Sequence, residues 1–207
     1  MKQLDIAIVG AGIGGLSAAL ALQKLGFRVT VHEQSPQLGE VGAGLSLSPT
    51  AAHGLDWLGL QPVLEAKAYK PEDQCMRHWQ DARPLSWINR GRSLLEKYGE
   101  RYYLIHRADL HEGLAARVLA NDPAAIALDH RCTQITQDAD GVELEFADGS
   151  RRRADVLVGA DGSRSAVRHA LFGALEPQYT GYIAWRGLVP MELVPQEILE
   201  PPSGVFI

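Results

Sequence analysis

Three glycines near the N-terminus have the spacing of a phosphate-binding turn. Gly10, Gly12 and Gly15 satisfy the pattern G-x-G-x-x-G. In such a turn the first glycine permits a tight exit from a strand, the second lets backbone approach a pyrophosphate, and the third lets helix and sheet pack closely. The following helix then points its N-terminal N–H groups at the phosphates. We therefore predict that the whole run contacts a dinucleotide: Gly10, Ala11, Gly12, Ile13, Gly14 and Gly15.

A carboxylate follows at the distance that dinucleotide sites require. Glu33 stands 18 positions after Gly15. A carboxylate there can accept hydrogen bonds from ribose hydroxyls and would repel a 2′-phosphate. We include its neighbour Gln34 in the predicted site. The alternative is a tight glycine turn followed by a solvated glutamate.

The segments around these residues supply the required context. Leu4 to Val9 is a short apolar run, as expected for a strand buried in a parallel sheet. Ile13 to Leu25 is rich in Ala and Leu and reads as a helix, with Gly26 as its stop, and Phe27 to Glu33 is β-branched and apolar. Strand, helix and strand fit one βαβ unit of about 30 residues. Glycines placed between a strand and a helix are much more specific than the bare pattern.

The rest of the chain also alternates between apolar segments and turns. From it we expect a loop over 34–48, a helix from Pro49 capped by Ser48, two strands within 74–88, a strand over 102–106, a helix over 108–119, a hairpin of 133–136 with 142–146, an exposed strand start at 151–153, a strand over 155–159, a helix over 163–172, a strand over 181–189, and a strand beginning at the last residues.

Composition excludes several classes of function. The 207 residues are 46% hydrophobic and 22% charged, which is ordinary for a soluble globular protein, and the net charge of −5 argues against a nucleic-acid partner. Two cysteines form neither a disulfide framework nor a metal cluster and fit a reducing cytosol. No apolar stretch approaches the roughly 18 residues that span a bilayer. The N-terminus runs directly into a strand, leaving no room for a signal peptide. We expect a cytoplasmic protein that does not bind a membrane.

Other catalytic patterns are poor. His106 and His111 are five positions apart, not at the i, i+4 spacing of a helical zinc pair, so we expect no metal. The sequence has no G-x-S-x-G elbow, which argues against a serine hydrolase. Residues 34 to 50 contain no redox cysteine pair, which argues against a flavin disulfide reductase.

Later segments resemble one family of flavoproteins. His106-Arg107-Ala108-Asp109-Leu110 resembles the R-x-D-L segment of FAD-dependent aromatic hydroxylases, the group A flavoprotein monooxygenases of the salicylate hydroxylase-like set. Residues 155–162, followed by Ser165 and Arg168, resemble their D-G fingerprint, the most specific part of the resemblance. The segments 42–44, 179–182 and 185–187 also look like that family, and the resemblance covers the whole chain.

The resemblance implies that the dinucleotide is FAD, and it implies roles for three further residues. Arg107 would contact the cofactor near its pyrophosphate or ribityl region; otherwise it is a surface arginine beside a helix start. Asp161 and Gly162 would form a turn that touches both FAD and the nicotinamide cofactor. The alternative is an ordinary strand-to-helix turn in which Asp161 caps the helix.

The resemblance also extends to three residues in loops and strands. Gly42 and Ala43 would approach the flavin ring, although a flexible glycine loop also accounts for them. Arg186 could face the substrate cavity or be an exposed strand arginine. No residue is assigned a catalytic role.

The fold class implied is α/β: a Rossmann-like FAD-binding βαβ domain with an inserted or adjoining mixed β-sheet substrate region. We assign residues 1–70 and 101–175 to the FAD-binding domain. Residues 71–100 and 176–207 form part of the substrate-binding sheet, truncated at the C-terminus.

The function implied is that of an FAD-dependent, NAD(P)H-consuming monooxygenase. It would use dioxygen to hydroxylate an aromatic or heteroaromatic small molecule through a flavin hydroperoxide, with NADH or NADPH as co-substrate. The single glycine-rich fingerprint agrees, because this family has no separate domain for the nicotinamide cofactor.

One departure concerns the family's second flavin motif, a G-D segment of the C-terminal half, which these 207 residues do not contain. We therefore expect an N-terminal fragment of a longer enzyme that binds FAD weakly or not at all and hydroxylates nothing by itself. The alternatives are an FAD-dependent reductase of another substrate class, such as isoprenoid lipids, and a non-catalytic FAD-fold module. The sequence leaves open the substrate, the position hydroxylated, NADH against NADPH, and the oligomeric state.

Overall fold

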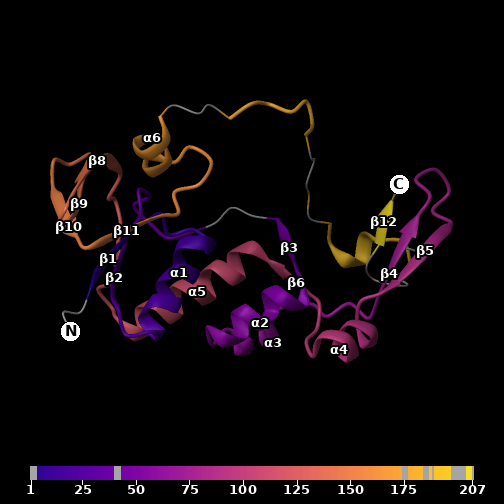
Figure 1. The fold of residues 1–207 in the computed structure, drawn as a ribbon. Coiled ribbons are helices and arrows are strands. Elements are labelled where there is room, and N and C mark those ends of the chain that lie inside the picture. The colour runs from indigo at the N-terminus through magenta and orange to yellow at the C-terminus, as the bar shows by residue number, and fades with distance from the viewer. Residues whose placement is uncertain are drawn as a thin grey trace. The chain divides into compact units, whose positions relative to one another are not determined.

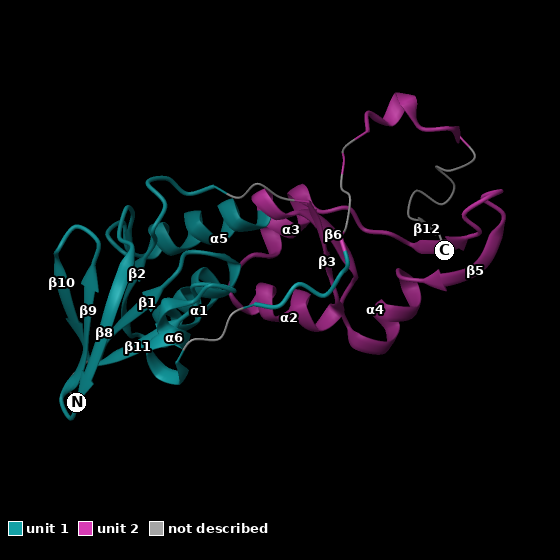
Figure 2. Ribbon diagram, turned by 90° about the horizontal axis from the view of Figure 1, so that it is seen from above, with its two compact units in different colours: residues 1–40, 110–182 teal, residues 41–109, 183–207 magenta. Residues whose placement is uncertain are grey.

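The computed structural model describes residues 4–39, 43–173, 177–183, 187, 189–196 and 204–206. The chain forms two compact units, each made of two separated stretches of sequence (Figure 2). Unit 1 comprises residues 1–40 and 110–182, and unit 2 comprises residues 41–109 and 183–207. The predicted division into FAD-binding and substrate-binding domains is a different partition and stays a prediction.

A parallel sheet is the centre of unit 1 (Figure 1). Its strand order is β11-β1-β2-β7. The strands are β1 (Asp5–Val9), β2 (Arg28–His32), β7 (Ile126–Ala127) and β11 (Val156–Gly159). Residues 6–9 of β1 are all buried, as expected for a strand paired on both sides and covered on both faces. The predicted first and second strands are confirmed.

Helices cover this sheet. Unit 1 contains α1 (Ile13–Lys24), most of α5 (Arg107–Asn121) and α6 (Ala166–Phe172). Helix α1 joins β1 to β2 and packs on both strands. It also lies beside α5, because Gln23 Nε2 donates to Val118 O at 3.4 Å and Asn121 Nδ2 donates to Gln23 Oε1 at 3.0 Å. The βαβ unit predicted from the glycine pattern is therefore present.

A second, antiparallel sheet completes unit 1. It runs in the order β10-β9-β8, with β8 (Cys132–Asp138), β9 (Gly141–Phe146) and β10 (Arg151–Ala154). The hairpin and the strand start at residue 151 are thus confirmed. Val142, Leu144 and Phe146 alternate along β9 and are buried in one core cluster with Val9 of β1. This core joins the two sheets of unit 1.

The described residues of unit 2 form two small sheets and three short helices, in addition to the start of α5. Strands β3 (Gly44–Leu47) and β6 (Tyr103–His106) form an antiparallel pair. The other sheet has the order β12-β4-β5, from β4 (Asp73–Arg77), β5 (Pro84–Asn89) and β12 (Gly204–Phe206). The helices are α2 (Pro49–Trp57), α3 (Gln61–Lys67) and α4 (Arg92–Tyr98), followed late in the chain by the 3₁₀ turn η1 (Met191–Leu193). The cap predicted for α2 is confirmed, since Ser48 Oγ accepts from Ala51 N at 3.4 Å.

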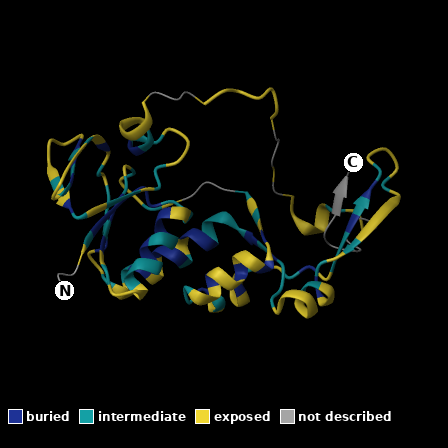
Figure 3. Ribbon diagram, in the orientation of Figure 1, coloured by how far each residue is buried: buried dark blue, intermediate teal, exposed yellow. Residues whose placement is uncertain are grey.

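Most residues of strand β5 are exposed (Figure 3). Leu85 is 42% exposed and Trp87 is 56% exposed. Trp79, in the connection before β5, is 68% exposed. Among the described residues β5 is also an edge strand, with β4 as its one partner.

Several elements differ from expectation. The segment 34–48 is not all loop, because β3 lies within it and pairs with the distant β6. Helices α3 and α4 and strand β7 were not expected, and α6 begins at Ala166 instead of residue 163. The described residues of 181–189 form no strand; residues 184–186 and 188 of that range lie outside the described part.

Candidate cofactor site

The exit from β1 requires a glycine at position 10. Gly10 has a φ of +101°, and its N–H donates to His32 O at 2.8 Å. A Cβ on Gly10 would lie 2.4 Å from Ala160 O and 2.9 Å from the Cα of Asp161. The turn therefore passes directly against the end of β11, with no space for a side chain.

The other glycines of the run divide into a packed one and two open ones. A Cβ on Gly15 would lie 1.9 Å from Gly10 O, so α1 packs too close to the turn for any side chain at this position. A Cβ on Gly12 or Gly14 would meet nothing within 4 Å among the described residues. Gly12 is the N-cap of α1, and the first turn of α1 carries no acidic residue. This end of the helix is accordingly uncrowded and electropositive, as an anionic ligand requires.

Glu33 is fastened to the glycine turn. Its Oε2 accepts from Ala11 N at 2.8 Å, and its Oε1 accepts from Ser35 N at 2.9 Å. A carboxylate oxygen can accept more than one hydrogen bond, so both atoms keep capacity for ribose hydroxyls. The structure thus brings Glu33 to the turn, as the spacing predicted. Its contact with a ribose stays a prediction, as does any contact of Gln34, which is exposed.

A buried histidine holds the same turn from another direction. His111 of α5 is 5% exposed, and its Nε2 lies 2.7 Å from Ala11 O. Sequence reasoning considered His111 as a metal ligand alone and missed this contact. A hydrogen bond between residues 100 positions apart leaves no local pattern in the sequence. Among the described residues no cluster of three metal-ligating side chains occurs.

Asp161 caps the last helix of unit 1. Its Oδ2 accepts from Ala166 N at 2.6 Å, and its Oδ1 accepts from Ser165 Oγ at 2.5 Å. Ser165 in turn accepts from Arg168 N at 2.9 Å. Gly162 has a φ of +79°, which favours glycine. The capping role of Asp161 is therefore present in the structure, while the cofactor contacts of Asp161 and Gly162 stay predictions.

In unit 2 the β3–β6 pairing brings two predicted residues together. Arg107, the first residue of α5, donates its N–H to Ala43 O at 3.2 Å. Gly44 pairs with His106 in the same ladder. The predicted residues Gly42 and Arg186 lie outside the described residues. The flavin contacts of Ala43 and Arg107 stay predictions.

A cavity of about 480 Å³ lies between β8 and α6 in unit 1. Three basic side chains contribute to its lining: Arg164, Arg168 and His169. Arg168 also donates to Ser163 O at 2.6 Å. A basic lining suits an anionic group, and the cavity adjoins the helix that Asp161 caps.

A histidine pair supports the end of β2. Nδ1 of His32 lies 3.2 Å from Nδ1 of His130, and both rings pack against Phe146. Burial, followed by the charges of His130 and Arg152, lowers the pKa of His32 to about 4, and the opposite charge of Asp5 does not overcome these effects. His32 is therefore neutral at pH 7, one residue before Glu33.

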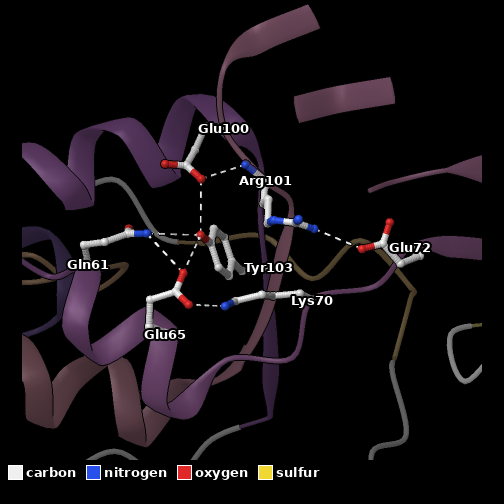
Figure 4. A network of polar contacts seen from close by, with 7 residues as sticks. All are labelled: Gln61, Glu65, Lys70, Glu72, Glu100, Arg101 and Tyr103. Atoms are coloured by element: carbon white, nitrogen blue, oxygen red, sulfur yellow. Dashed lines mark hydrogen bonds and ion pairs between the residues drawn. The ribbon is translucent and has the colours of Figure 1, made fainter. Parts of the chain in front are cut away.

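A polar network in unit 2 fastens α3 to β6 (Figure 4). The hydroxyl of the buried Tyr103 lies 3.4 Å from Glu65 Oε1 and 3.2 Å from Glu100 Oε1. Gln61 Nε2 donates to Glu65 Oε1 at 3.2 Å, and Lys70 pairs with the other oxygen of Glu65. Burial raises the pKa of Tyr103, so its proton is retained at neutral pH. The network is built to hold elements together, because every acid in it has a hydrogen-bond donor.

The geometry around Gly12 fits the pyrophosphate of a dinucleotide. The open space at Gly12 and Gly14 admits backbone approach, whereas Gly10 and Gly15 are glycines because protein atoms occupy the space of a side chain. A turn made for packing alone would not need the two open glycines. This difference supports a ligand at the N-terminus of α1.

Comparison with protein families identifies one match across nearly the whole chain. The sequence model described as FAD binding domain matches residues 3–203. No helix among the described residues is both long and apolar enough to cross a membrane.

Several curated proteins similar to this chain are named as monooxygenases or hydroxylases. A 3-amino-4-hydroxybenzoate 2-monooxygenase of Streptomyces cremeus is 40% identical over 194 residues, 94% of this chain and 48% of that protein. The 6-hydroxynicotinate 3-monooxygenase of Bordetella bronchiseptica is 36% identical over 91% of this chain and 48% of its own length. The 3-hydroxybenzoate 6-hydroxylase of Polaromonas naphthalenivorans is 33% identical over 99% of this chain and 51% of its own length. The chain thus spans about half the length of the curated relatives it matches.

Solved structures of two other proteins are also similar to this chain. The 2,6-dihydroxypyridine-3-hydroxylase of Arthrobacter nicotinovorans superposes with a TM-score of 0.78 at 27% identity, covering 97% of this chain and 47% of that one. The HpxO protein of Klebsiella pneumoniae, solved with FAD and uric acid, has a TM-score of 0.72 at 30% identity, covering 80% of this chain and 41% of its own.

Proposed function

The chain belongs to the FAD binding domain family, and from this membership we propose that it forms the FAD-binding part of an NAD(P)H-consuming monooxygenase. The resemblance to FAD-dependent aromatic hydroxylases, the α/β fold class and FAD as cofactor are confirmed by the family match and the similar proteins. The substrate we propose is a small aromatic or heteroaromatic ring, because three similar curated proteins are named for such compounds. Dioxygen is the proposed co-substrate and the cytoplasm the proposed location.

The observation that carries the proposal is the glycine turn with its attached carboxylate. Gly12 would present its backbone N–H to the FAD pyrophosphate, and Glu33, held by Ala11 N, would accept from the adenosine ribose. We also propose that Arg107 and Ala43, which are joined by a backbone hydrogen bond, contact the cofactor. We also propose that Asp161 and Gly162 contact the cofactors, and the basic lining of the adjoining cavity supports an anionic group in that region.

Bound FAD would supply the redox chemistry and the activation of oxygen. The chain's own contribution is binding and orientation. Two backbone N–H groups hold the Glu33 carboxylate at one place, so it need not be reorganised when a ribose arrives.

The test has two stages. The 207-residue chain is first titrated with FAD, and binding is followed by quenching of flavin fluorescence. The chain is then joined to the C-terminal half of the Streptomyces cremeus relative, and the chimera is incubated with ¹⁸O₂, NADH or NADPH, and a panel of hydroxylated aromatic and pyridine acids. We expect ¹⁸O in a hydroxylated product, and NAD(P)H oxidation that depends on the aromatic compound.

Other outcomes separate the alternative functions. Flavin reduction by NAD(P)H with no oxygen transfer to any ring would favour an FAD-dependent reductase. FAD binding with no reduction at all would favour a non-catalytic module. A chain and a chimera that both fail to bind FAD would contradict the proposal.

A further inference from the structure

Ala11 is held by the protein through both of its backbone polar groups. Its N–H donates to Glu33 Oε2 at 2.8 Å, and its carbonyl oxygen lies 2.7 Å from His111 Nε2. Ala11 is 2% exposed and His111 is 5% exposed. The orientation of the peptide that follows Ala11 is therefore fixed by a buried side chain.

That peptide carries the N–H of Gly12. In a trans peptide the C=O of one residue and the N–H of the next point in opposite directions. Because His111 binds the Ala11 carbonyl on one side, the Gly12 N–H must point to the other. The surroundings of Gly12 are open, since a Cβ there would meet nothing within 4 Å among the described residues.

We propose that His111 is a positioning residue for the FAD pyrophosphate: its Nε2–H binds Ala11 O and thereby aims the Gly12 N–H at a phosphate oxygen. This inference rests on the proposed function. It assigns His111 the tautomer with the proton on Nε2, because a carbonyl oxygen can only accept a hydrogen bond.

A buried imidazole needs a hydrogen-bond partner in any core. The contact between His111 and Ala11 must therefore be distinguished from a hydrogen bond that only offsets the burial of a polar ring. The distinction lies in which carbonyl is bound. His111 does not bind a carbonyl of its own helix, but one in the phosphate-binding turn 100 positions earlier. A leucine at position 111 would fill the space and release the peptide, whereas a glutamine would keep an N–H near the position of Nε2.

The experiment compares His111→Leu, His111→Gln and a matched control, His53→Leu. Nε2 of His53 lies 2.9 Å from Tyr98 O in unit 2, so the control also removes a contact between an imidazole and a carbonyl. Affinities are measured for FAD by fluorescence and for ADP by calorimetry, because ADP carries the adenosine and pyrophosphate groups without the flavin. Melting temperatures are recorded for the same samples.

We expect His111→Leu to bind both probes about tenfold or more weakly, the effect of misdirecting one charge-assisted hydrogen bond. His111→Gln and His53→Leu should stay within about threefold of the original chain. Equal affinities of His111→Leu and the original chain, or equal loss in His111→Gln and His111→Leu, would overturn the inference and leave the proposed function intact. If the original chain and the chimera both bind neither FAD nor ADP, the proposed function fails, and this inference fails with it.

A measurement on the original chain covers the case in which His111→Leu does not fold. The ¹⁵N shifts of the His111 ring should show a proton on Nε2 with and without ADP. The ¹⁵N–¹H signal of Gly12 should move when ADP is added. A ring protonated on Nδ1 alone, or an unmoved Gly12 signal at saturating ADP, would refute the proposal.

Discussion

The carboxylate of Glu33 accepts a hydrogen bond from the backbone N–H of Ala11, with 2.8 Å between Oε2 and N and 22 positions between the residues. The end of β2 is thereby tied to the turn that follows β1. A ligand that bound both places would meet a site assembled before its arrival, which limits the entropy lost on binding.

Replacing Glu33 should weaken FAD binding more than it weakens the fold. Glu33→Gln can still accept from Ala11 N but loses the negative charge, and we expect FAD affinity to fall about tenfold, or about 1.4 kcal/mol. Glu33→Ala should weaken binding further and also lower the free energy of unfolding by about 1 kcal/mol. Fluorescence titration and urea unfolding measure the two effects. The exposed Glu96 supplies the control, Glu96→Gln, and an equal loss of affinity there would point to general charge instead.

Alanine substitutions at two neighbouring glycines should have opposite effects on stability. At Gly15 the new Cβ would lie 1.9 Å from Gly10 O, and we expect a loss of about 3 kcal/mol or more. At Gly14 the Cβ meets no described atom within 4 Å, and helix propensity predicts a gain of about 0.5–1 kcal/mol. Chemical unfolding of the two variants checks the difference. Similar stabilities would show that the turn relaxes away from α1.

The cap of α6 predicts a stability effect at Asp161. Asp161→Ala removes the acceptor of Ala166 N and Ser165 Oγ, so the free energy of unfolding should fall by about 1–2 kcal/mol. Asp140→Ala, in an exposed hairpin turn, serves as the control. Unchanged stability together with weaker FAD binding would instead favour direct contact between Asp161 and the cofactor.

The His32–His130 pair predicts a pH dependence of stability. Burial and the neighbouring charges lower the pKa of His32 to about 4, below its usual value near 6.5. Between these two pH values His32 is protonated in the unfolded chain and neutral in the folded chain. The stabilisation is fully present above pH 6.5 and is lost as the pH falls from 6.5 towards 4. By linkage the loss amounts to about 3 kcal/mol in total, because one pKa unit corresponds to about 1.4 kcal/mol.

His32→Phe should flatten that dependence, because phenylalanine keeps the ring packing against Phe146 and cannot be protonated. Urea unfolding at pH 7.5 and pH 4.5 gives the comparison. The exposed His169, changed to phenylalanine, should leave the dependence as it is. Identical pH profiles for His32→Phe and the original chain would assign the effect to other groups.

The arrangement of the proposed nucleotide-binding residues could be predicted from the sequence because the signals for it are local. Gly10, Gly12 and Gly15 act through their own backbone. The position of Glu33 depends only on the strand, helix and strand of one βαβ unit. The structure places all four in unit 1, with Glu33 bonded into the turn. The contact of His111 could not be predicted, because it depends on how α5 packs beside the glycine turn.

The missed elements are short and depend on distant partners. Helices α3 and α4 have seven residues each, and neither begins with a side-chain cap from which its start could be predicted. Strand β7 has two residues and exists through pairing with β2. Strand β3 contains Gly44 and Ser46, which give little strand signal, and it is fixed by its ladder with β6.

The exposed apolar side chains of β5 affect how the isolated chain can be handled in solution. An edge strand that presents Leu85 and Trp87 offers unpaired backbone groups and apolar surface to any other extended chain. Self-association should therefore rise with protein concentration and spread from this edge. Fluorescence titrations of the 207-residue chain belong at micromolar concentrations or below, whereas the more concentrated samples for calorimetry and NMR would carry a charged residue at position 85 or 87 if self-association occurs.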